Sequence, residues 1–150
     1  MICMREQYIV PLSLHAATAV SEAVVGRLAD TLPVGSGPLL LVGCAEREWH
    51  AMPALVLTTT LRARGLDAVY TGASTSRDEL VSAILDRGPR AVLLSASLSS
   101  SLPRLRRQVE AVRGTGTPVV VGGRAFTHGR RWRALGAPAY AASPAPAVPG

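Results

Sequence analysis

From residue 38 onward, the chain alternates short apolar runs of β-forming residues with longer amphipathic segments. This alternation is typical of βαβ units, in which helices connect parallel strands. The runs AVLLS (91–95) and PVVVGG (118–123) lack the apolar–polar alternation of a half-exposed strand, so helices should cover both faces of the sheet. The sequence therefore predicts an α/β fold with a flavodoxin-like (Rossmann-like), doubly wound parallel sheet.

Five strands are expected in this sheet, and the helices between them should end at glycines. The strands are predicted over residues 39–44, 68–71, 91–95, 118–121 and 139–141. The helices are predicted over residues 49–64, 76–87, 102–112 and 126–135, closed by Gly65, Gly88, Gly114 and Gly136. Ser76 is a candidate N-cap, because Glu79 three residues later would complete a capping box.

Two segments of different composition flank the sheet. Residues 8–32 are predicted to be helical because they carry a broad apolar stripe: Ala16, Ala17, Ala19, Val20, Ala23, Val24 and Leu28. We therefore divide the chain into a short N-terminal helical segment with its linker (1–35), the α/β domain (36–142) and a tail (143–150). The tail, SPAPAVPG, has the composition of a disordered segment.

The composition argues against three classes of protein: nucleic-acid-binding, disulfide-rich secreted and membrane-spanning proteins. The net charge of +6 comes from arginine alone, since the sequence contains no lysine, and we attribute it to biased codon usage rather than to a nucleic-acid surface. Direct nucleic-acid binding by this chain is therefore not expected. The two cysteines are too few and too scattered for a disulfide framework, and the N-terminus lacks the pattern of a signal peptide. No apolar run reaches the roughly 18 residues of a membrane helix, so a soluble, cytoplasmic protein is expected.

The sequence contains one basic cluster of arginines, which also includes Trp132. A solvated helix face explains such a cluster, and the alternative is a surface for an acidic protein partner or a phosphate backbone. The cluster comprises Arg104, Arg106, Arg107, Arg124, Arg130, Arg131 and Arg133.

The candidate site lies where the strands end. In an open parallel sheet, ligands bind at the carboxyl ends of the strands, beside the point where strand order reverses. For the order 2-1-3-4-5, that crevice lies between the first and third strands. The first strand runs into Glu48-Trp49-His50, the third ends at Ser95, and the fourth ends at Gly122-Gly123.

The residue types at these strand ends suit a bound metal or cofactor. A histidine at a helix start can present one ring nitrogen to a metal while a partner such as Glu48 fixes the other nitrogen. Ser95 offers a small hydroxyl, and two glycines allow a ligand to approach the backbone. Each feature alone also has a structural explanation, since a loop histidine is often solvated and a Gly pair is often only a turn.

Three motifs in this order resemble the cobalamin (vitamin B12)-binding domain. They are Glu48-x-His50-x-x-Pro53, SASL from Ser95 to Leu98, and Gly122-Gly123, against the family pattern Asp/Glu-x-His-x-x-Gly, Ser-x-Leu and Gly-Gly. The resemblance implies cobalamin held base-off, with His50 as the lower axial ligand of cobalt in place of dimethylbenzimidazole and Glu48 orienting it. It also implies contacts to the cofactor from Trp49, Ser95, Ser97, Gly122 and Gly123, although Trp49 could instead pack on the sheet.

Three segments are similar to the cobalamin-dependent light-sensing transcriptional regulators: the EWH triplet, LRARGLDAVYTGAST and LGAPAYA. LHAATAV (14–20) resembles the helix that covers the upper cobalt face in those regulators, so residues 1–35 would be a remnant of that cap and His15 would contact the upper ligand. Three departures stand out: Pro53 replaces a glycine, Leu14 replaces a glutamate, and MREQ stands where the regulators have a Trp-His pair. Adenosyl-, methyl- and hydroxocobalamin all remain candidate forms of the cofactor.

The resemblance implies a cobalamin-binding sensor or regulatory module that is not itself an enzyme. Such a module would act on transcription, in response to light or cofactor, through a protein partner or homo-oligomer. One alternative is a corrinoid carrier for a methyltransferase or mutase. The other, motivated by Pro53 and Leu14, is a degenerate module that only makes protein contacts.

Overall fold

The computed structural model describes residues 23–28 and 37–126. Residues 23–28 form a six-residue helix. The rest alternates strands and helices in the order β1 (Leu39–Cys44), α2 (Met52–Ala63), β2 (Asp67–Tyr70), α3 (Arg77–Arg87), β3 (Ala91–Ser95), η1 (Ser99–Ser101), α4 (Leu102–Gly114), β4 (Val119–Gly122) and η2 (Arg124–Phe126).

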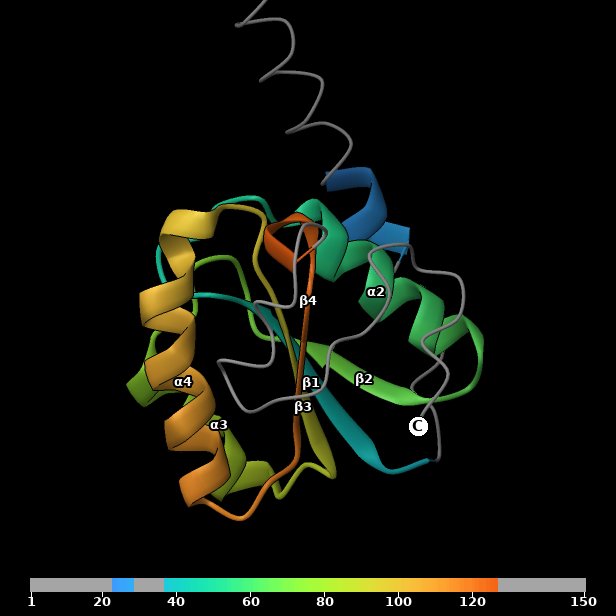
Figure 1. Cartoon of the computed structure of the whole chain (residues 1–150). Coiled ribbons are helices and arrows are strands. Elements are labelled where there is room, and N and C mark those ends of the chain that lie inside the picture. The colour runs from blue at the N-terminus through green and yellow to red at the C-terminus, as the bar shows by residue number, and fades with distance from the viewer. Residues whose placement is uncertain (1–22, 29–36, 127–150) are drawn as a thin grey trace, which may run out of the picture.

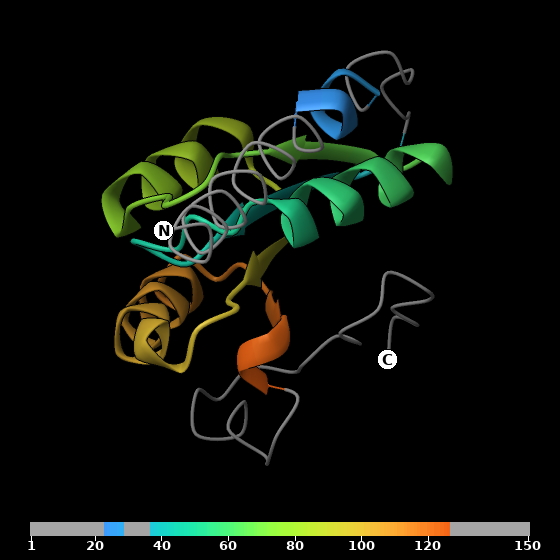
Figure 2. The same ribbon diagram turned by 90° about the horizontal axis from the view of Figure 1, so that it is seen from above.

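The described strands form one parallel sheet in the order β2-β1-β3-β4. Helix α2 covers one face of this sheet, and α3 and α4 cover the other (Figure 1, and from above in Figure 2). The predicted doubly wound α/β fold is therefore confirmed, and strand order reverses between β1 and β3 as expected. The expected fifth strand lies outside the described residues.

Helices on both faces give the sheet two apolar cores. Leu41 of β1 and Leu94 of β3 face α3 and α4, whereas Val42 and Leu93, their neighbours in sequence, face α2. Because successive side chains of a strand point to opposite faces, a strand buried on both sides must be apolar throughout. This explains the unbroken apolar runs in the sequence.

The predicted bounds of the four described strands are accurate to within one residue. Strands β1 and β3 have the predicted bounds, and β2 and β4 are shifted by one residue. The capping box of α3 is confirmed, since the Ser76 hydroxyl accepts the N–H of Glu79 at 3.2 Å and the Glu79 carboxylate accepts the N–H of Ser76 at 2.9 Å. Gly88 ends α3 with φ of 57°. Gly114, in contrast, is the last residue of α4, and the left-handed glycine that follows is Gly116 (φ 80°).

Several predicted elements lie outside the described residues. They are the helix over 126–135 apart from its first residue, the strand over 139–141, the tail, His15 and most of the N-terminal helix, of which 23–28 is helical. The division into three segments therefore stays a prediction. Within residues 23–28 and 37–126, no helix is both long and apolar enough to span a bilayer.

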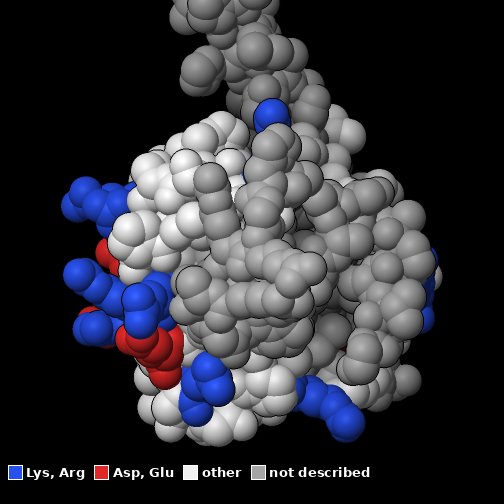
Figure 3. Space-filling model, in the orientation of Figure 1, with Lys and Arg blue, Asp and Glu red and all other residues white. Residues whose placement is uncertain are grey.

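On the flank formed by α3 and α4, arginines lie beside carboxylates. Figure 3 shows both charges side by side on this flank. Arg106 lies 3.3 Å from Glu110, and Arg77 lies 3.3 Å from Asp78. For this part of the basic cluster, the arrangement supports the interpretation as a solvated helix face.

Candidate functional site

The ends of three strands form one row at the carboxyl edge of the sheet. Cys44 of β1 is paired with Ser95 of β3, and Ser95 is paired with Gly122 of β4. The loop that carries Glu48 and His50 starts from this row, because the N–H of Ala45 donates to the Ser95 carbonyl at 2.9 Å. The predicted site residues of the first, third and fourth strands are thus brought together.

His50 lies in this loop and not in a helix. The predicted helix start at residue 49 is wrong, since α2 begins at Met52. The reason is Pro53: in a helix starting at Trp49, residue 53 would have to donate its N–H to the Trp49 carbonyl, and proline has no N–H. Proline is tolerated only in the first turn, where it now stands as the second helical residue. The position of His50 is therefore set by the loop and by the residues that His50 contacts, and not by a helix.

Glu48 fixes the orientation of the His50 ring. Its Oε1 lies 2.7 Å from Nδ1 of His50 and accepts the His50 backbone N–H at 3.2 Å. The Glu48 side chain is 0 % exposed, whereas that of His50 is 60 % exposed. With Nδ1–H donating to the carboxylate, the lone pair lies on Nε2, which has no hydrogen bond to any described residue.

The second carboxylate oxygen of Glu48 binds the loop after β3. Oε2 accepts the N–H of Ser97 at 3.0 Å, the N–H of Leu98 at 3.2 Å and the hydroxyl of Ser101 at 3.2 Å. Burial raises the pKa of Glu48, but the hydrogen bonds from Ser97, His50 and Leu98 outweigh burial and hold this pKa below its ordinary value of 4.5. Glu48 is therefore an anion at neutral pH.

Two of these donors change the interpretation of the sequence. Ser97, a predicted cofactor contact, uses its backbone N–H to hold Glu48. Ser101 was not predicted, because nothing in the run SLSSS distinguishes it from Ser99 and Ser100, which are exposed, whereas Ser101 is buried. Only the fold identifies it as a residue that positions Glu48.

Ser95 is a buried hydroxyl without a partner. Its side chain is on the α2 side of β3, and the residue is 1 % exposed. Among the described residues, its Oγ is the only buried side-chain oxygen or nitrogen that lacks a hydrogen bond. An unsatisfied buried hydroxyl is costly, so Ser95 suits a polar ligand group that reaches this end of the sheet.

Gly123 is required by the packing of the protein itself. Its φ is +108°, and a Cβ at this position would lie 2.4 Å from the carbonyl oxygen of Ala96. That same carbonyl accepts the N–H of Ala125 at 3.1 Å, which fixes η2 on the end of β3. The role of Gly122 and Gly123 in admitting a ligand stays a prediction.

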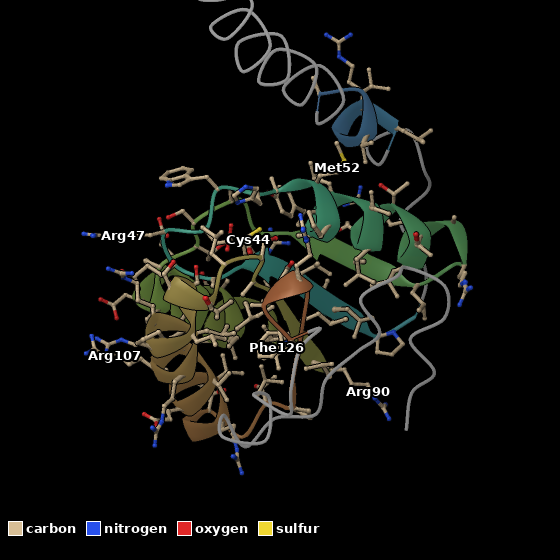
Figure 4. The ribbon with its side chains drawn as sticks, turned by 45° about the horizontal axis from the view of Figure 1, so that its top comes forward. Cys44, Arg47, Met52, Arg90, Arg107 and Phe126 are labelled. Carbon is tan, nitrogen blue, oxygen red and sulfur yellow. The ribbon has the colours of Figure 1, made fainter. Side chains whose placement is uncertain are left out.

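The remaining residues at this edge differ in their burial. Trp49 is 71 % exposed, so it does not pack on the sheet, and its contact with a cofactor stays a prediction. Cys44 is fully buried, and its thiol lies 3.8 Å from the carbonyl oxygen of His50. In Figure 4, Cys44 lies at the centre of the edge between Met52 of α2 and Phe126 of η2, and Arg47 and Arg107 point outward.

The chain forms a doubly wound α/β domain with one oriented histidine at the carboxyl edge of its sheet, where domains of this fold bind ligands. In the described part of the chain, no three His, Cys, Asp or Glu side chains are grouped to hold a metal ion. A metal bound at His50 would therefore have to bring most of its ligands with it, as the cobalt of a corrin does.

The chain belongs to the family of B12-binding domains, whose pattern matches residues 38–148. Cobalamin is accordingly its cofactor. Nε2 of His50 and the hydroxyl of Ser95, which have no hydrogen-bond partner among the described residues, fit this group, because they offer one metal ligand and one hydrogen-bonding group at this edge of the sheet. No curated protein matches the sequence.

Solved structures of corrinoid proteins share the fold. A cobalamin-binding protein from Desulfitobacterium hafniense DCB-2 has a TM-score of 0.64 and 18% identity, over 73% of this chain and 55% of that protein. The monomethylamine corrinoid protein of Methanosarcina barkeri has a TM-score of 0.64 and 21% identity, over 88% and 62%. The methanol:cobalamin methyltransferase complex MtaBC of the same organism has a TM-score of 0.56 and 21% identity, over 59% and 35%. The chain thus matches about a third to three fifths of the length of these proteins.

Proposed function

We propose that this chain is a cytoplasmic sensor or regulatory module that holds cobalamin base-off, with Nε2 of His50 as the lower axial ligand of cobalt. The observation that carries the proposal is the 2.7 Å contact between Glu48 Oε1 and His50 Nδ1. A buried carboxylate that accepts Nδ1–H fixes the ring orientation and leaves the lone pair on Nε2, facing outward. The module itself catalyses nothing and passes the state of its cofactor to a protein partner or a second copy.

The other predicted contacts complete the proposed cofactor site. Ser95, Ser97, Gly122 and Gly123 surround the nucleotide tail, and the exposed ring of Trp49 contacts the edge of the corrin. His15, placed by resemblance alone, contacts the upper ligand. When bound, cobalamin supplies a cobalt ion whose upper ligand can be exchanged or lost, and this change is the signal that the module reports.

A corrinoid carrier is the second candidate. It is favoured by the fold shared with the monomethylamine corrinoid protein and with the methanol:cobalamin methyltransferase complex. In a carrier, the cobalt would take part in a reaction that a partner enzyme catalyses. The EWH triplet, which is similar to the light-sensing regulators, favours the sensor.

Absorbance spectroscopy tests the proposal. We expect purified protein to retain hydroxocobalamin through gel filtration with the spectral shift of histidine ligation, and the His50→Ala variant to lose that shift. Identical spectra for the two proteins would refute ligation by His50. Spectra with adenosylcobalamin in darkness and after green light then test the sensor, whereas methyl or adenosyl turnover on mixing with a corrinoid-dependent enzyme would establish the carrier instead.

A further inference from the structure

The loop between β2 and α3 (71–76, TGASTS) interlocks with the loop that carries His50. Ser74 makes two bonds across this contact. Its hydroxyl accepts the backbone N–H of Arg47 at 2.9 Å, and its own N–H donates to the carbonyl of Glu48 at 2.9 Å. Ser74 thus holds the peptide groups on both sides of the segment 47–48, which ends two residues before the proposed ligand His50.

Arg47 and Ser74 share an unusual backbone conformation. Their φ angles are 62° and 49°, and within the described part of the chain they are the only residues other than glycine with positive φ. Such conformations persist where the surrounding structure imposes them. Here the two residues are joined by the hydrogen bond from the Arg47 N–H to the Ser74 hydroxyl. Each loop therefore helps to impose the backbone conformation of the other loop.

A buried glutamine connects the same two loops at a second point. Gln108 of α4 is 0 % exposed; its Oε1 accepts the N–H of Glu46 at 3.0 Å, and its Nε2 donates to the carbonyl of Thr75 at 2.7 Å. Gln108 therefore holds the base of the loop pair within the core. Ser74 holds the exposed part, which is closer to His50 along the chain.

We propose that Ser74 is a positioning residue for the lower axial ligand: by bracketing Arg47 and Glu48, it sets the angle at which Glu48 presents the His50 ring to cobalt. This inference rests on the proposed function. Without the hydroxyl, the Arg47 N–H turns to water and residue 47 relaxes from the left-handed region. That relaxation rotates the Cα–Cβ bond of Glu48 and weakens its contact with Nδ1 of His50.

Hydroxocobalamin titrations of variants test this role, with unfolding midpoints measured for each protein. Ser74→Ala should weaken binding about two- to tenfold, the range expected for one hydrogen bond, and should lower the fraction of histidine-ligated cobalamin. Ser74→Gly keeps the left-handed backbone but lacks the hydroxyl, so it should behave like Ser74→Ala. Ser82→Ala, at an exposed serine of α3 whose side chain has no hydrogen bond to any described residue, is the matched control and should bind like the wild type.

The decisive comparison repeats Ser74→Ala in the His50→Ala background. A residue that acts through His50 should have no effect once His50 is absent, so the two substitutions should be fully coupled. Equal weakening in both backgrounds, or unchanged binding in the single variant, would overturn this inference alone. A wild-type spectrum without histidine ligation would instead overturn the proposed function, and this inference with it.

Discussion

Replacing Glu48 by glutamine should detach His50 from cobalt while leaving the domain folded. The carboxylate accepts five hydrogen bonds, two from His50 at Oε1 and three from Ser97, Leu98 and Ser101 at Oε2. A glutamine amide has one oxygen and one NH2 group. If the oxygen keeps the three donors of the β3 loop, the NH2 group must face Nδ1 and the backbone N–H of His50.

Two costs follow from this geometry. The backbone N–H of His50 would face another donor, and a buried unsatisfied group costs about 1–3 kcal/mol of folding free energy. Nδ1 would have to accept a hydrogen bond, which moves the ring proton to Nε2 and removes the lone pair that cobalt needs. Since loss of such an orienting partner typically weakens metal binding about 10–100-fold, we expect the Kd for hydroxocobalamin to rise by that factor.

Absorbance titration measures the Kd and the ligation state in the same experiment. Glu79→Gln is the matched control, because Glu79 also accepts a backbone N–H but lies at the exposed start of α3. That control should bind cobalamin like the wild type. If Glu48→Gln kept the histidine-ligated spectrum and the wild-type Kd, the assignment of Glu48 as the orienting residue would be refuted.

The same variant should alter the acid sensitivity of the apo protein. The pKa of Glu48 in the folded state lies below its ordinary value of 4.5, because its hydrogen bonds outweigh the opposing effect of burial. Its contribution to stability is therefore present above the unfolded-state pKa and is lost as the pH falls through the folded-state pKa. Urea unfolding from about pH 6 to about pH 3 should show a steeper loss of stability for the wild type than for Glu48→Gln.

Three further substitutions test the structure around the site. Ser76→Ala removes the capping box of α3 and should lower the free energy of unfolding by about 1 kcal/mol in urea titrations. Gly123→Ala places a Cβ against the Ala96 carbonyl at a φ of +108° and should cost at least about 2 kcal/mol, more than Gly116→Ala, which has positive φ but open space. Ser95→Ala removes a buried hydroxyl without a partner, so it should leave the apo protein equally stable or more stable while weakening cobalamin binding by about 1 kcal/mol. Weaker apo stability with unchanged binding would contradict that assignment.

The strands could be predicted from the sequence because burial on two faces leaves a strong pattern. Continuous apolar runs predicted the first and last residues of β1 and β3 correctly. The expected strand order also predicted that Ser95 lies beside the end of β1. The predicted start of α2 at residue 49 was three residues too early, because Pro53 would then fall beyond the first helical turn. A proline in the first turn excludes a start at residue 49 but does not by itself identify Met52 as the first helical residue.

The site was only partly predictable, because its contacts differ in sequence separation. Glu48 and His50 are two residues apart in one loop, so their pairing could be expected from spacing alone. Ser101 lies 53 residues from Glu48 and has the same chemistry as the serines next to it. Ser74 acts through a left-handed backbone that no residue type in TGASTS specifies at that position. Such contacts depend on which loops the fold places together.

We also expect cofactor loading to depend on the order of folding, because the proposed geometry of Glu48 and His50 needs donors from a distant part of the chain. The donors to Glu48 in the β3 loop lie 49 to 53 residues further along the chain. Contacts between such distant segments form late, so a nascent chain carries Glu48 and His50 long before they have their final geometry. Cobalamin should therefore be captured only after β3 has paired with β1 and the start of α4 has packed against the sheet. From then on, its binding free energy protects the completed domain against unfolding and proteolysis.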